Sequence, residues 1–200
     1  MNNSLNKINL NKEFWDERYK NGYIGWDIRY ISTPLKEYFD QLKDKYLRIL
    51  IPGSVNGYEA EYLYNLGFKN VFLLDWSVIA LENFRKRSPL FPEKNLINEN
   101  FFQHIGKYDL IVEQTFFCAI NPDMRKKYAE KIFNLLSMNG NLAGLLFNYE
   151  LNKDEPPFGG SKEEYETYFK GLFEFKVFET AYNSIKPRDG KELFINLVRK

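Results

Sequence analysis

The chain has 200 residues, 44% of them hydrophobic, and a formal net charge of +1. A chain of this length can bury one core, so we expect one domain over residues 1–200, and the near-neutral charge argues against nucleic acid as a partner. The sequence contains neither a signal-peptide pattern nor the roughly 20 apolar residues that span a bilayer, which predicts a cytoplasmic protein without a membrane partner.

The first 45 residues differ in pattern from the rest of the chain. Two amphipathic helical patterns, at 12–20 and 34–43, are joined by an aromatic-rich segment. Segments that precede an open α/β core commonly fold over the carboxyl ends of its strands, where such sheets bind ligands. We therefore expect residues 1–45 to form a helical cap or lid over a core at 46–200.

From Leu47 onward, short apolar runs alternate with longer amphipathic segments. This alternation is typical of a mostly parallel sheet with helices on both faces, so the predicted fold class is α/β. The expected strands are 47–51, 70–75, 96–97, 108–113, 141–147, 173–178 and 193–198. The expected helices are 58–66, a helix from a Ser77 cap to Arg87, 122–136, and a helix capped by Ser161. Asn139-Gly140 is interpreted as the turn into the fifth strand.

A glycine-containing turn at 51–57 follows the first strand. Backbone N–H groups and the start of a helix would face the sheet edge there, as in nucleotide sites. Asp75 ends the second strand about 20 residues later, where a carboxylate can accept hydrogen bonds from both hydroxyls of a ribose. The alternative role for Asp75 is to cap the next helix, although Ser77 is better placed for that. The turn and the acidic residue together predict an adenosine ligand.

Other residue types carry weaker signals. Aromatic residues make up 18% of the chain, which is consistent either with an aromatic-rich core or with walls around a flat or cationic ligand. Cys118 is the single cysteine and His104 the single histidine, which excludes a disulfide within the chain and predicts no metal site. No neighbouring histidine could activate Cys118, so we interpret it as a packed residue. For Arg125, a solvated position on a helix is the favoured interpretation.

Blocks of residues in a fixed order point to a known family. In chain order they are Trp26-Asp27, Thr33-Pro34-Leu35, Ile51-Pro52-Gly53, Gly57-Tyr58-Glu59-Ala60, Tyr108-Asp109-Leu110-Ile111, Phe116-Phe117-Cys118-Ala119-Ile120-Asn121-Pro122, Arg125, Leu135-Leu136, Asn139-Gly140 and Pro156-Pro157-Phe158. Together they resemble the thiopurine S-methyltransferase superfamily, especially its thiol and halide methyltransferase branch. The resemblance implies a Rossmann-like class I methyltransferase with a seven-stranded sheet. It also implies that S-adenosylmethionine is the cofactor and S-adenosylhomocysteine the product.

The same resemblance implies which residues contact the cofactor. They are Trp15, Tyr19, Trp26, Gly53, Asp75, Asn100, Phe101 and Gln114. By analogy with the family, Gly53 lies against the methionine part, Asp75 binds the ribose, and Asn100 with Phe101 contacts the adenine. The two tryptophans would face the sulfonium, because an aromatic ring attracts a cation by roughly 0.5–2 kcal/mol. The alternative is that they anchor the cap helix in the core.

Methyl transfer from a sulfonium is an in-line displacement, so the protein mainly aligns the reactants and excludes water. We expect no catalytic side chain and no covalent enzyme intermediate. The acceptor is expected to be a small thiol, sulfide or similar soft nucleophile. Its pocket is expected to be formed by Trp15, Trp26, Phe116, Phe117 and Phe158. A monomer is the expected state.

Some residues depart from the family pattern. Ser54 and Val55 stand where the family has a cysteine and a second glycine, and Asn100 replaces an acidic residue. A β-branched residue is unfavourable where the backbone approaches a ligand. The first alternative function is therefore a non-catalytic relative that binds the cofactor weakly or not at all. A nicotinamide-dependent oxidoreductase is disfavoured because the turn lacks G-x-G-x-x-G spacing, and a nucleic-acid methyltransferase because no basic run is present.

Overall fold

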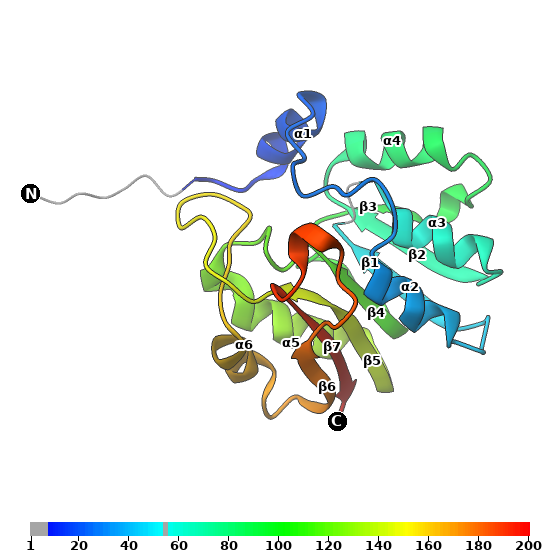
Figure 1. The fold of residues 1–200 in the computed structure, drawn as a ribbon. Helices are drawn as coiled ribbons and strands as arrows, with labels where there is room; N and C mark the ends of the chain where they lie inside the picture. Colours follow the sequence, from blue (N-terminus) through cyan, green and yellow to red (C-terminus); the bar gives the residue numbers. More distant parts are fainter. Residues whose placement is uncertain (1–7, 54–55) are drawn as a thin grey trace, which may run out of the picture.

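One sheet lies at the centre of the structure, a computed structural model that describes residues 8–53 and 56–200 (Figure 1). Its strands are β1 (Arg48–Pro52), β2 (Asn70–Asp75), β3 (Leu96–Asn98), β4 (Tyr108–Gln114), β5 (Leu136–Phe147), β6 (Phe173–Thr180) and β7 (Glu192–Arg199). Their order in the described part of the chain is β3-β2-β1-β4-β5-β7-β6. The strands from β3 to β5 pair in parallel, and β7 runs antiparallel to both of its neighbours. The expected seven-stranded, mostly parallel sheet is confirmed.

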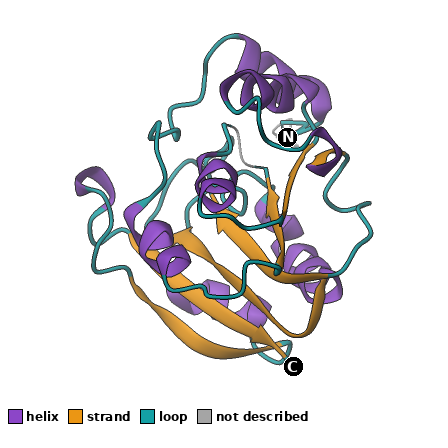
Figure 2. Ribbon diagram, turned by 90° about the vertical axis from the view of Figure 1, so that its right-hand side faces the viewer, coloured by secondary structure: helices purple, strands orange, loops and turns teal. Residues whose placement is uncertain are grey.

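Helices cover both faces of this sheet (Figure 2). They are α1 (Lys12–Lys20), α2 (Thr33–Asp40), α3 (Tyr58–Asn65), α4 (Val78–Arg87), α5 (Arg125–Leu135) and α6 (Lys162–Phe169), with short 3₁₀ turns η1 (Glu93–Asn95), η2 (Pro122–Met124) and η3 (Lys186–Arg188). The core side chains of α2, α3 and α4 belong to one hydrophobic cluster, and those of α5 and α6 to another. Every helix in the described ranges is too short or too polar to cross a membrane.

The central strand β1 shows why the core has two halves. Leu50 belongs to the cluster on the α5 and α6 face, whereas Ile49 and Ile51 belong to the cluster on the α2–α4 face. All three side chains are fully buried. Successive residues of a strand point to opposite faces, so a strand covered on both sides is apolar at every position. Each such side chain stabilises the fold by about 1.5–3 kcal/mol through burial.

The two N-terminal helices occupy different places. Leu35 and Phe39 of α2 are fully buried in the α2–α4 cluster, because residues four apart lie on one side of a helix. This helix ends at Asp40, earlier than the expected residue 43. In contrast, all residues of α1 stay at least partly exposed, and α1 packs mainly on α4. Of the two helices expected to form the cap, α2 therefore belongs to the helix layer that covers one face of the sheet. The other helix, α1, lies with the segment after it at the sheet edge.

The fifth strand begins earlier than the sequence indicates. β5 starts at Leu136, directly after α5, and not at Asn141. Asn139 has a φ of 60°, and the pairing with β4 shifts register between Tyr108 and Leu110. The expectation of a turn before the strand was wrong, because Asn139-Gly140 makes an irregularity within a strand that is already paired.

The register of the parallel strands sets the position of the functional edge. Pro52 of β1 is level with Leu74 of β2, and the N–H of Gly53 donates a 2.7 Å hydrogen bond to the carbonyl of Leu74. Gly53 and Asp75 are thereby adjacent at the carboxyl ends of their strands. The chain order of the strands reverses between β1 and β4, and open α/β sheets bind ligands at such a reversal.

Candidate active site

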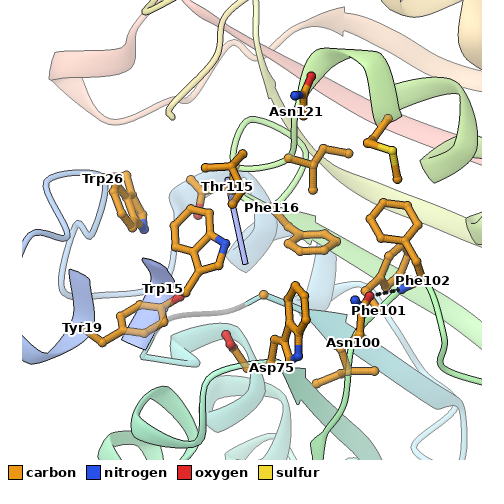
Figure 3. A pocket seen from close by; sticks show the side chains of 17 residues that line it. Trp15, Tyr19, Trp26, Asp75, Asn100, Phe101, Phe102, Thr115, Phe116 and Asn121 are labelled. Atoms are coloured by element: carbon orange, nitrogen blue, oxygen red, sulfur yellow. Dashed lines mark hydrogen bonds between the residues drawn. The ribbon is translucent and has the colours of Figure 1, made fainter. Parts of the chain in front are cut away.

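A cavity of about 250 Å³ lies at the carboxyl ends of β1, β2 and β4 (Figure 3). Its walls come from α1, the turn after β1, the end of β2 and the loops that follow β3 and β4. The residues expected from the sequence that line it are Trp15, Tyr19, Trp26, Gly53, Asp75, Asn100, Phe101 and Phe116. These residues come from five separate parts of the chain, and the fold brings them together at one site.

Gly53 begins the turn after β1 and has no room for a side chain. Its φ is +62°, a conformation that favours glycine. A Cβ at this position would lie 2.1 Å from Cδ2 of Phe116, so the phenyl ring rests directly on the glycine backbone. Ser54 and Val55, the departures from the family pattern, lie outside the described residues.

Asp75 at the end of β2 presents a carboxylate oxygen to the cavity region. The side chain is 6% exposed, and its Oδ1 accepts a 2.8 Å hydrogen bond from the N–H of Ser77. Within residues 8–53 and 56–200, its buried Oδ2 has no hydrogen-bond partner. Burial, with a smaller contribution from the nearby charge of Asp16, raises the pKa of Asp75 to about 7. Such an orphaned oxygen suits a ligand that brings hydroxyl donors, so the residues present fit the ribose of an adenosyl cofactor.

Ser77, and not Asp75, supplies the helix cap. The Oγ of Ser77 accepts a hydrogen bond from the N–H of Ala80 in the first turn of α4, at 3.4 Å. Ser77 also donates to a carboxylate oxygen of Asp16 in α1. The start of α4 therefore holds α1 above the end of β2.

The loop after β3 carries Asn100 and Phe101, the pair expected from the family resemblance to contact the adenine. Oδ1 of Asn100 accepts a 2.9 Å hydrogen bond from the N–H of Phe102, which is the dashed line in Figure 3. Oδ1 of Asn100, which was expected to accept from a ligand, thus already accepts one hydrogen bond within the loop. The side-chain NH₂ of Asn100 is a donor that a ligand can use. The ring of Phe101 packs against Phe116 at 5.0 Å and against Tyr128 at 5.6 Å between ring centroids.

Aromatic side chains of the N-terminal segment form the opposite wall. Trp15 lies next to both Tyr19 and Trp26, with ring centroids 6.4 and 6.1 Å away (Figure 3). Burial raises the pKa of Tyr19 well above its ordinary value, with contributions from Asp75 and Asp16. The two tryptophans face the cavity, and the carbonyl of Trp26 accepts a 2.6 Å hydrogen bond from Arg188.

Three expected site residues lie outside this cavity. Gln114 lines two smaller neighbouring cavities, and its buried Oε1 has no partner in the described part of the chain. Phe117 is 2% exposed and packs against Tyr165 in the core, and Phe158 is 5% exposed. The expectation that Phe117 and Phe158 would wall the same pocket as Trp15 was wrong, because Phe116 faces the cavity while its neighbour Phe117 points into the core.

The expected solvated position of Arg125 was also wrong. It is 1% exposed and so is not a solvated helix residue. Its guanidinium donates to Glu164 of α6 and to the carbonyl of Gly159, both at 2.9 Å, and lies over the ring of Phe117. Arg125, at the start of α5, thus connects this helix to α6 and to the loop that precedes α6. Cys118 is buried as expected, and burial raises the pKa of its thiol.

Sequence reasoning also missed part of the lining. The missed residues are Leu10, Leu74, Trp76, Phe102, Thr115, Ala119, Ile120, Asn121 and Met124. Trp76 could have been found, because it directly follows Asp75 at a strand end. Thr115 has a φ of 58°, and a left-handed threonine gives no signal in the sequence. Among its described residues, the cavity lining contains no lysine or arginine.

Known proteins resemble this chain over most of its length. The family model for thiopurine S-methyltransferase matches residues 10–197. A probable thiol methyltransferase 2 of Arabidopsis thaliana is 28% identical over 185 residues, covering 89% of this chain and 81% of the relative. Thiocyanate methyltransferase 1 of Brassica oleracea is 29% identical with the same coverage. The crystal structure of the Burkholderia thailandensis 1,6-didemethyltoxoflavin-N1-methyltransferase with S-adenosylhomocysteine has a TM-score of 0.75 at 14% identity, covering 96% of this chain and 87% of that one.

Proposed function

The chain belongs to the thiopurine S-methyltransferase family, and from this we propose that the cavity at the edge of its sheet is the site of methyl transfer. The protein is an S-adenosylmethionine-dependent methyltransferase that acts on thiol-type acceptors. The observation that carries the assignment of the site is the buried Oδ2 of Asp75 next to Gly53, an oxygen without a hydrogen-bond partner among the residues that the structure describes.

Asp75 is proposed to bind the ribose. Its Oδ1 is held by the Ser77 N–H, which fixes the carboxylate plane and leaves Oδ2 to accept from a hydroxyl. A hydrogen bond to a charged group contributes about 1.5–3 kcal/mol. Asn100 and Phe101, which line the cavity beyond the end of β2, are proposed to contact the adenine.

Gln114 and Gly53 are proposed to face the amino-acid part of the cofactor. Gln114 lines a small cavity that shares Trp26 and Thr115 with the main one. Its unpartnered Oε1, within the described chain, is an acceptor suited to an ammonium group.

The aromatic wall is proposed to surround the reacting centre. When bound, the cofactor supplies a methyl group on a positively charged sulfur. The rings of this wall that face the cavity are those of Trp15, Tyr19, Trp26 and Phe116. A ring face in contact with the sulfonium attracts its charge by roughly 0.5–2 kcal/mol, and the rings together keep water out. Their contribution is to orient and desolvate, which is what an in-line displacement requires of the protein.

The acceptor is proposed to be a small thiol, sulfide or similar soft nucleophile that enters the same cavity. A thiol near its ordinary pKa supplies a few per cent thiolate at neutral pH, so no general base is required. The described lining lacks lysine and arginine, which supports an acceptor without several negative charges. The comparisons give no support to a non-catalytic relative.

We further propose that the protein acts as a monomer in the cytoplasm, with neither nucleic acid nor a membrane as a partner. The net charge of +1 supports the part of this proposal that concerns nucleic acid. Size-exclusion chromatography with light scattering tests the monomer, and a dimer mass would contradict it.

Calorimetry with S-adenosylmethionine and S-adenosylhomocysteine tests the site. We expect saturable heat with the wild type and at least about tenfold weaker binding for Asp75→Asn. Asp109→Asn is the matched control, because Asp109 accepts from the N–H of Arg48 at the opposite edge of the sheet. Absence of heat at millimolar ligand would contradict the proposal.

A panel of acceptors with labelled methyl donor tests the reaction. Thiols, sulfide, thiopurines, halides and oxidised selenium or tellurium anions are compared for volatile and non-volatile products. We expect label in the products of thiols or sulfide. Labelling of none of these acceptors by a protein that binds the donor would contradict the proposed acceptor class.

A further inference from the structure

Glu113, the next-to-last residue of β4, is fully buried, and its carboxylate accepts three hydrogen bonds. Its Oε1 accepts from the N–H of Phe116 at 2.8 Å and from the N–H of Phe117 at 2.9 Å. Its Oε2 accepts from the hydroxyl of Tyr128 in α5 at 2.6 Å. Glu113 lies outside the cavity lining, so it does not act on the reactants directly.

The donors belong to the parts that shape the cavity. The loop after β4 turns at Thr115, whose φ of 58° is a strained backbone conformation, and the carboxylate holds the two amides that follow. This loop places the ring of Phe116 directly on the backbone of Gly53. A different loop position would move this ring, and with it the wall between the β1 turn and the β4 loop.

Tyr128 extends the same arrangement to the loop after β3. Its ring packs against Phe101 at 5.6 Å and Phe116 at 6.0 Å between centroids. Its hydroxyl is held by Glu113. One carboxylate therefore fixes both the backbone of Phe116 and the tyrosine on which two cavity-lining rings rest.

The neighbouring strand leaves space for this residue. Gly144 of β5 is level with Glu113, and a Cβ at Gly144 would lie 2.4 Å from the Cβ of Glu113. A buried carboxylate is costly, and an apolar residue of similar size would often be as stable. An apolar residue, however, would leave the amides of Phe116 and Phe117 without an acceptor. The two loop amides require an acceptor at the position of Oε1, and the hydroxyl of Tyr128 requires one at the position of Oε2.

We propose that Glu113 is a positioning residue for methyl transfer, which sets the place of Phe116 over Gly53 through the loop amides and Tyr128. This inference rests on the proposed function. It predicts that loss of the oxygens disturbs the transfer step more than cofactor binding, since the ribose is proposed to be bound by Asp75, whose hydrogen bond to Ser77 does not involve Glu113.

The test compares Glu113→Leu with Glu113→Gln in kinetics and in calorimetry with S-adenosylhomocysteine. We expect Glu113→Leu to lower kcat by about tenfold or more, because small misplacements in a site are costly, with Kd within about threefold of the wild type. Glu113→Gln should recover most of kcat, since its carbonyl can accept from both amides and its NH₂ can donate to the oxygen of Tyr128.

A pair of tyrosine variants gives a milder version of the test, which also serves if Glu113→Leu fails to fold. Tyr128→Phe removes the bond to Glu113, and Tyr165→Phe removes a buried 2.8 Å bond to the carbonyl of Phe147, away from the cavity. Both should lower Tm, but only Tyr128→Phe should lower kcat. Equal kcat in the two variants, or a Glu113→Leu protein with unchanged kcat, would overturn the inference. A wild type that binds no S-adenosylhomocysteine would instead contradict the proposed function.

Discussion

Asp75 and Glu113 are both buried carboxylates at the ends of strands, but their oxygens are satisfied differently. Glu113 accepts from three donors of its own chain. Asp75 accepts from Ser77, and its second oxygen has no partner in the described residues. A carboxylate with all its bonds made within the protein can organise structure, whereas one with an oxygen left over is suited to a ligand.

The pKa of Asp75 gives a pH dependence of cofactor binding. Burial raises this pKa to about 7 in the free protein, and ribose hydroxyls that donate to the carboxylate stabilise its charged form. Binding therefore favours the ionised side chain and lowers its pKa. Below pH 7 we expect the Kd for S-adenosylhomocysteine to rise by up to about tenfold per pH unit, and to level off above pH 8.

Calorimetry from pH 5.5 to about pH 8.5 measures this dependence, in a range that includes the pKa of Asp75. Asp75→Asn should bind weakly with a much flatter profile, and Asp109→Asn should keep the wild-type slope. A wild-type Kd that does not change across this range would refute an ionised Asp75 as the ribose acceptor.

Among the elements, α1 depends on few contacts for its position. All its residues remain at least partly exposed, and Asn11 caps it through a 3.0 Å bond from the N–H of Phe14. Its specific contact with the core is the pair between Asp16 and Ser77. Arg18 also pairs with Glu155 in the loop before α6, at 2.7 Å. In Figure 1 this loop, in yellow, lies beside the blue N-terminal segment. Polar contacts at the sheet edge thus position a helix that carries two cavity residues.

Removal of the Asp16 contact should loosen this helix without unfolding the core. For Asp16→Ala we expect roughly three- to tenfold weaker binding of S-adenosylhomocysteine, because the lost bond involves a charged group that is partly exposed. Tryptic cleavage at Arg18 and Lys20 should be faster, and Tm should change little. Measurement at pH 8 avoids the effect of Asp16 on the pKa of Asp75.

Glu17→Ala is the matched control, because Glu17 lies exposed on the same helix. It should bind like the wild type. If Asp16→Ala also bound like the wild type and resisted trypsin equally, α1 would have no part in forming the cofactor site.

The elements also show what could be predicted from the sequence. Strand periodicity and the glycine turn located Gly53 and Asp75, because both lie at ends of apolar strands. Periodicity alone left the roles of Trp15 and Trp26 open, since their placement depends on how α1 docks. The faces of Phe116 and Phe117 depend on a loop with a left-handed residue, which no periodic pattern describes. Local signals therefore located the strand ends, and tertiary contacts decided the cavity walls.

At the scale of the whole molecule, three buried carboxyls within residues 8–53 and 56–200 have pKa values raised to about 7. They are Glu59, Asp75 and Glu113, and burial is the main cause in each. Their ordinary values are 3.8 for aspartate and 4.5 for glutamate, so the folded protein binds more protons than the unfolded chain between these values and pH 7. The stability from these groups is fully present below about pH 4 and is lost as pH rises through 7.

Thermal unfolding of the ligand-free protein should therefore show a higher Tm at pH 5 than at about pH 8. Saturating S-adenosylhomocysteine should make the fall in Tm between these two pH values smaller, because the ligand favours ionised Asp75. Asp75→Asn should also reduce it in the absence of ligand. A Tm that rises steadily from pH 5 to about pH 8 in the free protein would show that these carboxyls are ionised at little cost.

The bond from Arg188 to the carbonyl of Trp26 joins parts of the chain that are far apart in the sequence. During synthesis on the ribosome, the strands β1, β2 and β4 can pair before residue 188 emerges from the exit tunnel. The wall that contains Trp26 gains this anchor only when the last segment has been translated. Nascent chains stalled before that point also lack β7, the strand on which β6 pairs, so they should hold only the parallel strands β1 to β5 and a cavity wall without its anchor. Retention on immobilised S-adenosylhomocysteine would separate them from released protein.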